Sequence, residues 1–178
     1  PVSPFNMRKV MLAGLTKQMR LAAKKKPAVA IIKLNSLVDQ VLIDKIHLAA
    51  KTGVHVQMVI RGICCAHTSQ KSYKGSLRAI SIIDDYLEHA RVMVFGAGAD
   101  RQVFISSADW MVRNLDHRVE AACPIVDKEI QDELVEILNI QLAENVKGRI
   151  LDNEQSNTYV QRDKNEPMVR SQEAIYKY

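Results

Sequence analysis

The chain has 178 residues, of which 47% are hydrophobic and 25% are charged, and this composition excludes a disordered protein. No apolar run approaches the roughly 18 residues that a membrane span needs, and the amphipathic first 26 residues are not expected to be a signal peptide. The net charge of +5 favours an anionic partner, which could be nucleic acid, a phosphate polymer or an acidic membrane surface.

The first residue and the cysteines bear on the origin of the chain. Because the sequence opens on Pro1 and not on methionine, we expect a fragment of a longer protein. Cys64, Cys65 and Cys123 make a poor disulfide framework, which indicates a reducing cytosol. A zinc site at Cys64, Cys65 and His67 has no second ligand pair at usable spacing, so we expect ordinary buried thiols.

The first third of the chain predicts a helix followed by a strand–helix–strand unit. Ser3 stands at the N-cap position of an amphipathic helix that ends in lysines before Pro27. Residues 28–34 form a short apolar run typical of a buried strand. Asp39 is expected to cap a second helix, and residues 54–60 form the next strand. A connection of this length places the two strands in parallel.

The rest of the chain predicts further strands and one long helix. Residues 77–83 and 91–95 have strand patterns, and residues 102–106 return after a glycine-rich turn to form a hairpin. Residues 118–123 are expected to be another strand, after which Asp127 caps a long amphipathic helix. No repeat or linker interrupts the sequence, so one domain is expected.

Residues suited to phosphate chemistry follow the predicted strands. In α/β sheets, ligands bind beyond the carboxyl ends of parallel strands, and Arg61 stands directly after such a strand. Lys33 and Asn35 end the preceding strand, so we expect them to be neighbours of Arg61. His89 and Arg91 precede a strand two residues apart, and in an extended chain they point to the same face. A histidine and a guanidinium would then share one surface.

Hydroxyls and a carboxylate follow at the end of the returning strand, in Ser106, Ser107 and Asp109. They could orient the His89 imidazole, because a histidine base needs a partner on its other nitrogen. Phosphoryl transfer requires such positioned groups together with cations for the phosphate oxygens. The residues alone leave open that His89 is structural and that the arginines are surface charges. The remaining histidines are expected to be structural or exposed; they are His47, His55, His67 and His117.

Several phrases of the sequence resemble the C-terminal domain of bacterial polyphosphate kinases. They are KLNSLVD (33–39), VIRGICC (59–65), RAISIIDDYLEHARV (78–92), FISSADWMVRNLDHRVE (104–120) and SNTYVQRD (156–163). The resemblance spans nearly the whole chain, and a phrase as long as ISSADWM is highly specific. It implies that residues 1–178 are a single domain, the second of two phospholipase D-like domains. The implied fold is α/β, with a mixed β-sheet flanked by helices.

The resemblance also implies an altered catalytic signature. The phospholipase D superfamily carries His-x-Lys followed downstream by Gly-Ser-x-Asn. Here residues 89–91 read His-Ala-Arg and residues 106–109 read Ser-Ser-Ala-Asp. Arginine in place of lysine and aspartate in place of asparagine suit a kinase half-site better than a working phosphodiesterase.

The activity implied by the resemblance is reversible transfer of the terminal phosphate of ATP to inorganic polyphosphate. It proceeds through a phosphohistidine on the preceding domain, so this fragment alone is expected to be inactive. His89 matches the second histidine of the family site, and Arg61 and Arg118 match arginines that contact the nucleotide phosphates. Supporting roles are expected for Lys33, Asn35, Arg91, Ser107, Asp109 and Arg113.

The same resemblance implies the cofactor, the partners and the location. Mg²⁺ is expected on the upstream domain, so no metal ligand is assigned here. The expected partners are ATP or ADP, inorganic polyphosphate, the upstream domains of the same polypeptide and further copies in a homo-oligomer. A cytoplasmic location is expected, with the periphery of the inner membrane as an alternative.

Two features remain open, the 66–75 loop and the competing functions. The loop has one glycine and no proline where the family loop is expected to be rich in both, which leaves its contacts undefined. A phospholipase D-type phosphodiesterase or nuclease would use His89 as nucleophile, but the changes at Arg91 and Asp109 count against it. A nucleic-acid-binding module is disfavoured because only 5% of the residues are aromatic. Arg149 is expected to lie outside the site.

Overall fold

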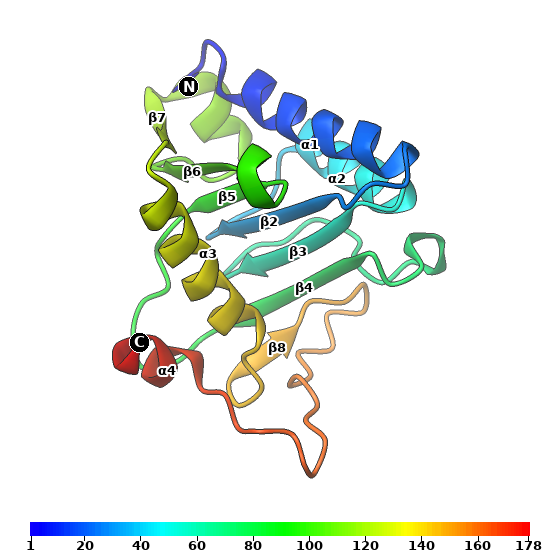
Figure 1. The fold of residues 1–178 in the computed structure, drawn as a ribbon, viewed down its shortest axis with the longest axis vertical. Helices are drawn as coiled ribbons and strands as arrows, with labels where there is room; N and C mark the ends of the chain where they lie inside the picture. Colours follow the sequence, from blue (N-terminus) through cyan, green and yellow to red (C-terminus); the bar gives the residue numbers. More distant parts are fainter.

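The computed structural model describes residues 1–178 and contains one mixed sheet of eight strands (Figure 1). The strand order is β1-β7-β6-β5-β2-β3-β4-β8. The strands are β1 (Val2–Ser3), β2 (Val29–Leu34), β3 (His55–Ile60), β4 (Leu77–Ile82), β5 (Val92–Phe95), β6 (Gln102–Ser106), β7 (Glu120–Ile125) and β8 (Gly148–Ile150). This architecture confirms the expected α/β class with a mixed sheet.

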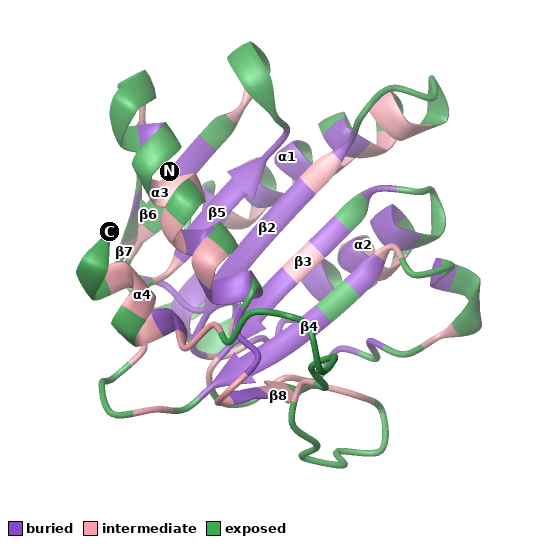
Figure 2. Cartoon of the chain, turned by 60° about the horizontal axis from the view of Figure 1, so that its bottom comes forward, coloured by how far each residue is buried: buried purple, intermediate pink, exposed green.

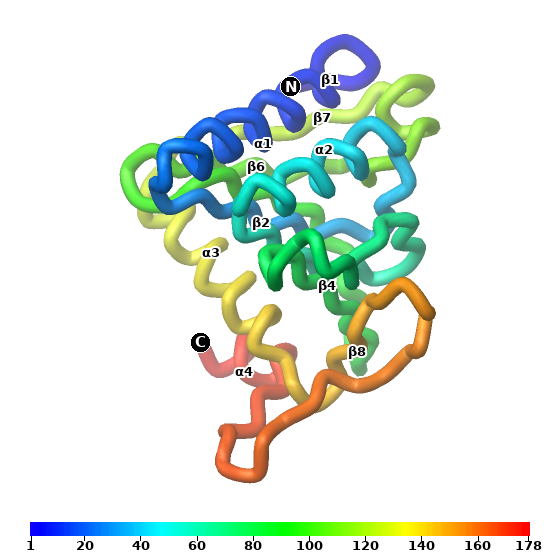
Figure 3. Tube along the Cα trace, turned by 90° about the vertical axis from the view of Figure 1, so that its right-hand side faces the viewer, coloured from blue at the N-terminus to red at the C-terminus, as the bar shows by residue number.

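Helices cover both faces of the sheet. The α-helices are α1 (Met7–Ala23), α2 (Gln40–Lys51), α3 (Lys128–Leu142) and α4 (Ser171–Lys177). Figure 1 shows α3 crossing in front of the strands, with α1 and α2 on the other side. Short helical turns occupy Lys71–Tyr73, Gly98–Asp100 and Arg113–His117, the last of them a π-helix. Residues 151–170 run as a long loop outside the layers, from β8 to α4 (Figure 3).

The side chains of the central strands alternate between the two faces of the sheet, and this divides the hydrophobic core into two parts. In β2, Ala30, Ile32 and Leu34 belong to the larger core beneath α1 and α2, and Ile31 belongs to the smaller core beneath α3. Successive side chains of a strand point to opposite faces, so a strand between two helical layers is apolar on both. The central strands are accordingly buried along most of their length (Figure 2).

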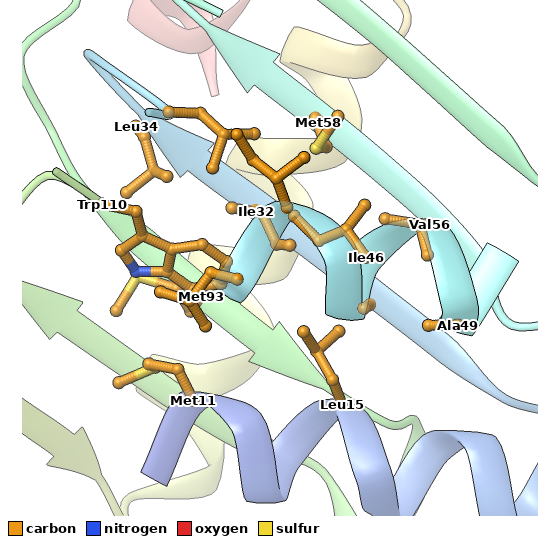
Figure 4. Close-up of a cluster of buried hydrophobic side chains, with 14 of the residues drawn as sticks. Met11, Leu15, Ile32, Leu34, Ile46, Ala49, Val56, Met58, Met93 and Trp110 are labelled. Atoms are coloured by element: carbon orange, nitrogen blue, oxygen red, sulfur yellow. The ribbon is translucent and has the colours of Figure 1, made fainter. Parts of the chain in front are cut away.

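The larger core also fixes the segment that follows β6. Trp110 is fully buried beside Leu34 of β2, Met93 of β5 and Met11 of α1 (Figure 4). Its backbone oxygen accepts hydrogen bonds from the N–H groups of residues 38 and 39, both at 2.8 Å. The backbone next to Asp109 is therefore anchored to the segment that joins β2 to α2.

The strand directions bring several termini to one edge of the sheet. β2, β3 and β4 are mutually parallel, whereas β5 runs antiparallel to β2, β6 to β5 and β7 to β6. β2, β3, β4 and β6 therefore end where β5 and β7 begin. We call this the carboxyl edge; its strand ends are Leu34, Ile60, Ile82, Val92, Ser106 and Glu120. In Figure 1, the arrowheads of β2, β3 and β4 point toward the side where α4 lies.

The sequence predictions of β2 to β6 and of α2 and α3 are confirmed to within two residues. The Asp39 side chain caps α2 by accepting a hydrogen bond from the N–H of Leu42 at 3.0 Å. The predicted N-cap Ser3 is wrong, because Ser3 pairs with Glu120 in β1 and the helix begins only at Met7. The predicted strand 118–123 is shifted to Glu120–Ile125 by its pairing with β6.

Other side chains differ from expectation in burial. Cys64 is half-buried, and burial raises the pKa of its thiol, but Cys65 and Cys123 are exposed, so the expectation of buried thiols is wrong for these two. The half-buried His47 ring stacks on Tyr73 with centroids 5.7 Å apart. The other histidines that were expected to be structural or exposed are all exposed; they are His55, His67 and His117. None of the helices combines the length and the apolar character needed to cross a bilayer.

Candidate functional site at the carboxyl edge

His89 lies exposed on the segment that leads from β4 into β5, and its neighbour in space is Arg91. Arg91 Nη1 lies 3.2 Å from His89 Nδ1, 3.5 Å from Nε2 and 3.1 Å from the His89 carbonyl oxygen. The expectation that a histidine and a guanidinium share one surface is confirmed. Arg91 fixes both the backbone and the ring of His89.

Asp109 holds Arg91 in turn. Its Oδ2 accepts a hydrogen bond from Arg91 Nη2 at 3.0 Å, and its Oδ1 accepts the N–H groups of Asn35 at 2.8 Å and Ser36 at 3.1 Å. Asp109 is buried, so this carboxylate joins the end of β6 to the end of β2. The expectation that it contacts the imidazole is wrong, because the Arg91 guanidinium lies between them.

Asn35 links Arg61 to the same group. Asn35 Oδ1 accepts a hydrogen bond from Arg61 Nε at 2.9 Å, and Asn35 Nδ2 donates one to the His89 carbonyl oxygen at 3.4 Å. Since the only side-chain hydrogen bond of Arg61 uses Nε, both terminal nitrogens of its guanidinium are available to a ligand. The predicted proximity of Asn35 and Arg61 is confirmed.

Arg61 borders two open hollows. The first has a volume of about 540 Å³ and lies between the segment after β3, residues 61–66, and the segment 149–157. The second, of about 430 Å³, lies along residues 82–88. Arg61 and Gly62 line both hollows, so this position is common to them. The volumes are in the range of small-molecule sites.

Arg149 lies in this region, contrary to expectation. It lines the larger hollow together with Arg61. Its guanidinium stacks over the Tyr159 ring, 3.5 Å from the centroid, and Nη1 donates to the Asn157 carbonyl oxygen at 2.8 Å. The sequence placed Arg149 outside the site because the pairing of the short strand β8 with β4 has no local signal.

Lys33 is part of a buried ion pair and does not face the hollows. Its Nζ lies 2.6 Å from Glu88 Oε2, which also accepts a hydrogen bond from Gln141 Nε2 of α3 at 2.8 Å. Burial lowers the pKa of Lys33, although the Glu88 charge acts in the opposite direction. Glu88 directly precedes His89 in the sequence. Its role in joining the sheet, α3 and the His89 segment requires the tertiary structure.

Ser107 binds the start of β7 instead of the imidazole. Its hydroxyl donates to a Glu120 carboxylate oxygen, and the other oxygen of Glu120 accepts from Asn114 Nδ2 at 2.8 Å. Arg118 is exposed two residues before the start of β7. Arg113 is exposed on the π-helix and makes no side-chain hydrogen bond. The carboxyl edge thus unites five of the expected residues directly: Asn35, Arg61, His89, Arg91 and Asp109.

Metal ligands are not grouped at the site. No three His, Cys, Asp or Glu side chains of the chain lie close enough together to hold a metal ion. The cationic groups that line the hollows are the guanidinium groups of Arg61 and Arg149, which suit phosphate oxygens because they can donate two parallel hydrogen bonds. Carboxylates line the hollows as well, Asp152 in the larger one and Asp84, Asp85 and Glu88 in the smaller one.

Comparison with known proteins identifies relatives over almost the whole chain. Residues 1–172 match the family described as polyphosphate kinase C-terminal domain 2. Polyphosphate kinases of Salmonella typhimurium and Vibrio cholerae are 41% and 45% identical over 177 residues, 99% of this chain. The chain spans only 26% and 25% of their respective lengths.

Solved structures show the same relationship. The polyphosphate kinase of Porphyromonas gingivalis superposes with a TM-score of 0.95 at 35% identity, covering 100% of this chain and 27% of the other. Nuc of Salmonella typhimurium, a phospholipase D family member, superposes with a TM-score of 0.61 at 16% identity, covering 85% of this chain and 95% of its own. The second similarity extends to the fold alone, and it confirms the expected phospholipase D-like architecture.

Proposed function

This chain belongs to the polyphosphate kinase C-terminal domain 2 family. We propose that it forms one half of the active site of a polyphosphate kinase. The proposed reaction is reversible transfer of the terminal phosphate of ATP to inorganic polyphosphate. The observation that carries the proposal is the Arg61 guanidinium, which Asn35 holds through Nε while its terminal nitrogens remain available, and Asn35 also binds the His89 carbonyl oxygen. Phosphoryl transfer depends mainly on such positioning and on charge stabilisation.

We assign His89 the role of a proton donor or a direct contact to the transferred phosphate. A guanidinium donates hydrogen bonds and cannot accept them, so we assign the tautomer in which the nearer ring nitrogen, Nδ1, accepts from Arg91. A neutral imidazole then carries its proton on Nε2. That N–H is available to a phosphate oxygen or to a leaving group.

Arg118 is proposed to contact the nucleotide phosphates from the β7 side of the carboxyl edge, opposite Arg61. It is exposed and lies two residues before Glu120, which binds Ser107. Two guanidinium groups on different strands could hold separate phosphate oxygens. The proposed roles of Asn35, Arg91 and Asp109 are to position Arg61 and His89.

Other parts of the proposed mechanism lie outside this chain. The chain spans about a quarter of the length of its curated relatives, and we propose that the phosphorylated histidine and the Mg²⁺ ligands belong to upstream domains. On this proposal the chain alone does not turn over ATP. Homo-oligomerisation and a cytoplasmic location, or one at the periphery of the inner membrane, belong to the same proposal.

A phosphodiesterase or nuclease remains the second candidate, because the fold resembles that of Nuc. Two residues count against it. Arg91 and Asp109 stand where the superfamily signature has lysine and asparagine, and they form an ion pair with each other. Hydrolysis of a model phosphodiester by the chain would favour this candidate.

The proposed function is tested by His89→Ala in the full-length protein. We expect turnover of ATP and polyphosphate to fall by roughly 10² to 10⁴, the usual contribution of a positioned acid or base, with an unchanged circular dichroism spectrum. His55→Ala is the matched control, because His55 is exposed at the opposite end of β3 and its side chain bonds only Gln57. Normal turnover in His89→Ala would return His89 to a structural role.

A further inference from the structure

The amide of Gln172, on the C-terminal helix α4, binds the segment that carries His89. Gln172 Oε1 accepts the N–H of Tyr86 at 2.9 Å, and Nε2 donates to the Tyr86 carbonyl oxygen at 2.8 Å. Nε2 also donates to Glu88 Oε1 at 2.9 Å. One side chain therefore satisfies both backbone groups of residue 86 and the carboxylate adjacent to His89.

Arg170 reinforces this contact from the same end of α4. Its Nε and Nη2 donate to the two carboxylate oxygens of Asp84 at 2.8 and 2.6 Å, and Nη2 also donates to Asp85 at 2.7 Å. The hydrogen bond from Arg170 lowers the pKa of Asp84. Residues 84, 85, 86 and 88 are thus all held by two side chains of the C-terminal segment.

α4 is itself fixed to the body of the domain. The buried carboxylate of Glu144, just after α3, accepts the N–H of Ser171 at 2.6 Å and its hydroxyl at 2.7 Å. Figure 1 shows α4 beside the lower end of α3 and the chain that leaves β4. A rigid connection therefore runs from α3 through α4 to the His89 segment.

Apolar packing does little to hold that segment. Ile83, Tyr86 and Leu87 are 68%, 75% and 69% exposed, and the chain from residue 83 to residue 91 has no regular secondary structure. A segment without a buried apolar anchor relies on its polar contacts for its position. Lys33 and Gln141 bind Glu88, and Asn35 and Arg91 bind His89. Before Glu88, the side-chain contacts that hold the segment come from the C-terminal residues Arg170 and Gln172.

We propose that Gln172 is a positioning residue for His89, and that the C-terminal helix completes the site by clamping the chain before it. This inference rests on the proposed function of His89. The side chain acts through residues 86 and 88 and does not touch the proposed substrate. Loss of the clamp would displace the imidazole and loosen the 82–88 wall of the smaller hollow, but leave most of the lining of the larger hollow in place. Displacement of a reacting group by about 1 Å costs roughly 100-fold in rate.

The chemistry of the clamp requires an amide at this position. Gln172→Glu keeps the length and one acceptor for the Tyr86 N–H, but it loses both donors. It also sets a carboxylate against the Glu88 carboxylate and the Tyr86 carbonyl oxygen. Gln172→Ala removes all three hydrogen bonds. If Gln172 only filled space, the isosteric glutamate would be tolerated.

The test compares these variants in the full-length protein by kinetics and by amide hydrogen exchange. We expect both to lower kcat by roughly 10- to 100-fold with the KM for ATP within twofold of wild type. The Tyr86 amide should exchange at least about tenfold faster in Gln172→Ala, with the amides of β2 unchanged. Gln161→Ala is the matched control, because Gln161 is exposed and bonds only the Tyr159 carbonyl oxygen.

Several results would overturn the inference. These are normal kcat in both Gln172 variants, a normal kcat in Gln172→Glu alone, unchanged exchange at Tyr86, or an equal loss in Gln161→Ala. The exchange measurement also shows whether Gln172→Ala simply destabilises the whole domain. Accelerated exchange throughout β2 would mean general unfolding, and would reject a local clamp. His89→Ala, measured in parallel, separates the two hypotheses. If it is fully active, the proposed function fails; if it is inactive while the Gln172 variants are normal, only the clamp fails.

Discussion

The Arg91 guanidinium and the Asp109 carboxylate form an ion pair, with Nη2 and Oδ2 3.0 Å apart, at the two positions where the signature departs from the phospholipase D pattern. The side chains are 13% and 8% exposed, so each charge is largely removed from water and compensated mainly by the other. The two side chains therefore act as one coupled pair. They place a guanidinium, which is always charged, against the His89 ring.

The pair predicts the behaviour of Asp109→Asn. The amide can still accept the N–H groups of Asn35 and Ser36, but it leaves the Arg91 charge without its partner. We expect the free energy of unfolding to fall by roughly 3 kcal/mol, as for other buried pairs that lose one member. Urea denaturation of the chain measures this. In a double-mutant cycle with Arg91→Ala, additive effects would show that the pair contributes nothing as a unit.

At positions 61 and 118 we expect that the guanidinium group itself is required, and that a positive charge alone is not sufficient. In the full-length protein, Arg61→Lys and Arg118→Lys should each reduce transition-state stabilisation by roughly 2 to 4 kcal/mol, because lysine cannot donate two parallel hydrogen bonds to a phosphate. The loss should fall on kcat more than on the KM for ATP. Arg61→Lys also removes the Nε hydrogen bond to Asn35.

The control for these variants is Arg20→Lys, since Arg20 is exposed on α1 and makes no side-chain hydrogen bond. Steady-state kinetics with ATP and polyphosphate compare the three proteins. Near-normal turnover in both site variants would mean that charge alone matters. An equal loss in Arg20→Lys would mean that the site has been placed wrongly.

Local sequence patterns predicted most of the fold because the main elements carry local signals. The β-branched run of β2, the Asp39 cap of α2 and the Asp127 cap of α3 each depend on a few adjacent residues. β1 and β8 have two and three residues and exist only through pairing with distant strands. Such pairing has no local signal.

The same distinction applies to the site. Arg61, His89 and Arg91 stand next to predicted strands, so their common edge could be inferred. Glu88 and Gln172 could not be assigned, because Glu88 binds residues 53 and 55 positions away and Gln172 binds residues 84 and 86 positions away. Arg149 reaches the site only through the pairing of β8 with β4. The orientation of Ser107 was wrong for a similar reason, since its partner Glu120 belongs to the next strand.

The hollow beside Arg61 predicts weak, salt-dependent binding of polyphosphate by the chain alone. Arg61 and Arg149 both line it, and cations that converge on a flexible polyanion release counterions on binding. Isothermal titration at two ionic strengths should show a marked loss of affinity at the higher one. Arg149→Ala should weaken binding and flatten this dependence, whereas Arg20→Ala should leave both unchanged. Affinity indifferent to salt would mean that these arginines do not form the site.

Stability should depend on pH through Glu144, which joins α3 to α4. Its buried carboxylate accepts hydrogen bonds from the N–H groups of Val146, Lys147 and Ser171 and from the Ser171 hydroxyl, at 2.6 to 2.8 Å. Burial acts to raise the pKa of Glu144, but these hydrogen bonds outweigh it, and the net effect lowers the pKa below its ordinary value of 4.5. The folded state therefore favours the ionised form of the Glu144 carboxyl group.

The sign of the pH dependence follows from linkage. A depressed pKa stabilises the folded state at pH values above the unfolded-state pKa, and the contribution is lost as the pH falls through the folded-state value. Glu144→Gln should lower the free energy of unfolding by roughly 1.5 to 3 kcal/mol at pH 7, the scale of a hydrogen bond to a charged group. The difference between wild type and variant should shrink as the pH falls below about 4.5. Urea denaturation of both proteins between pH 7 and pH 3 measures it.

Glu129→Gln is the control, because Glu129 is exposed in the first turn of α3. A Glu144→Gln deficit that stays constant across this range would show that ionisation of Glu144 does not stabilise the connection between α3 and α4.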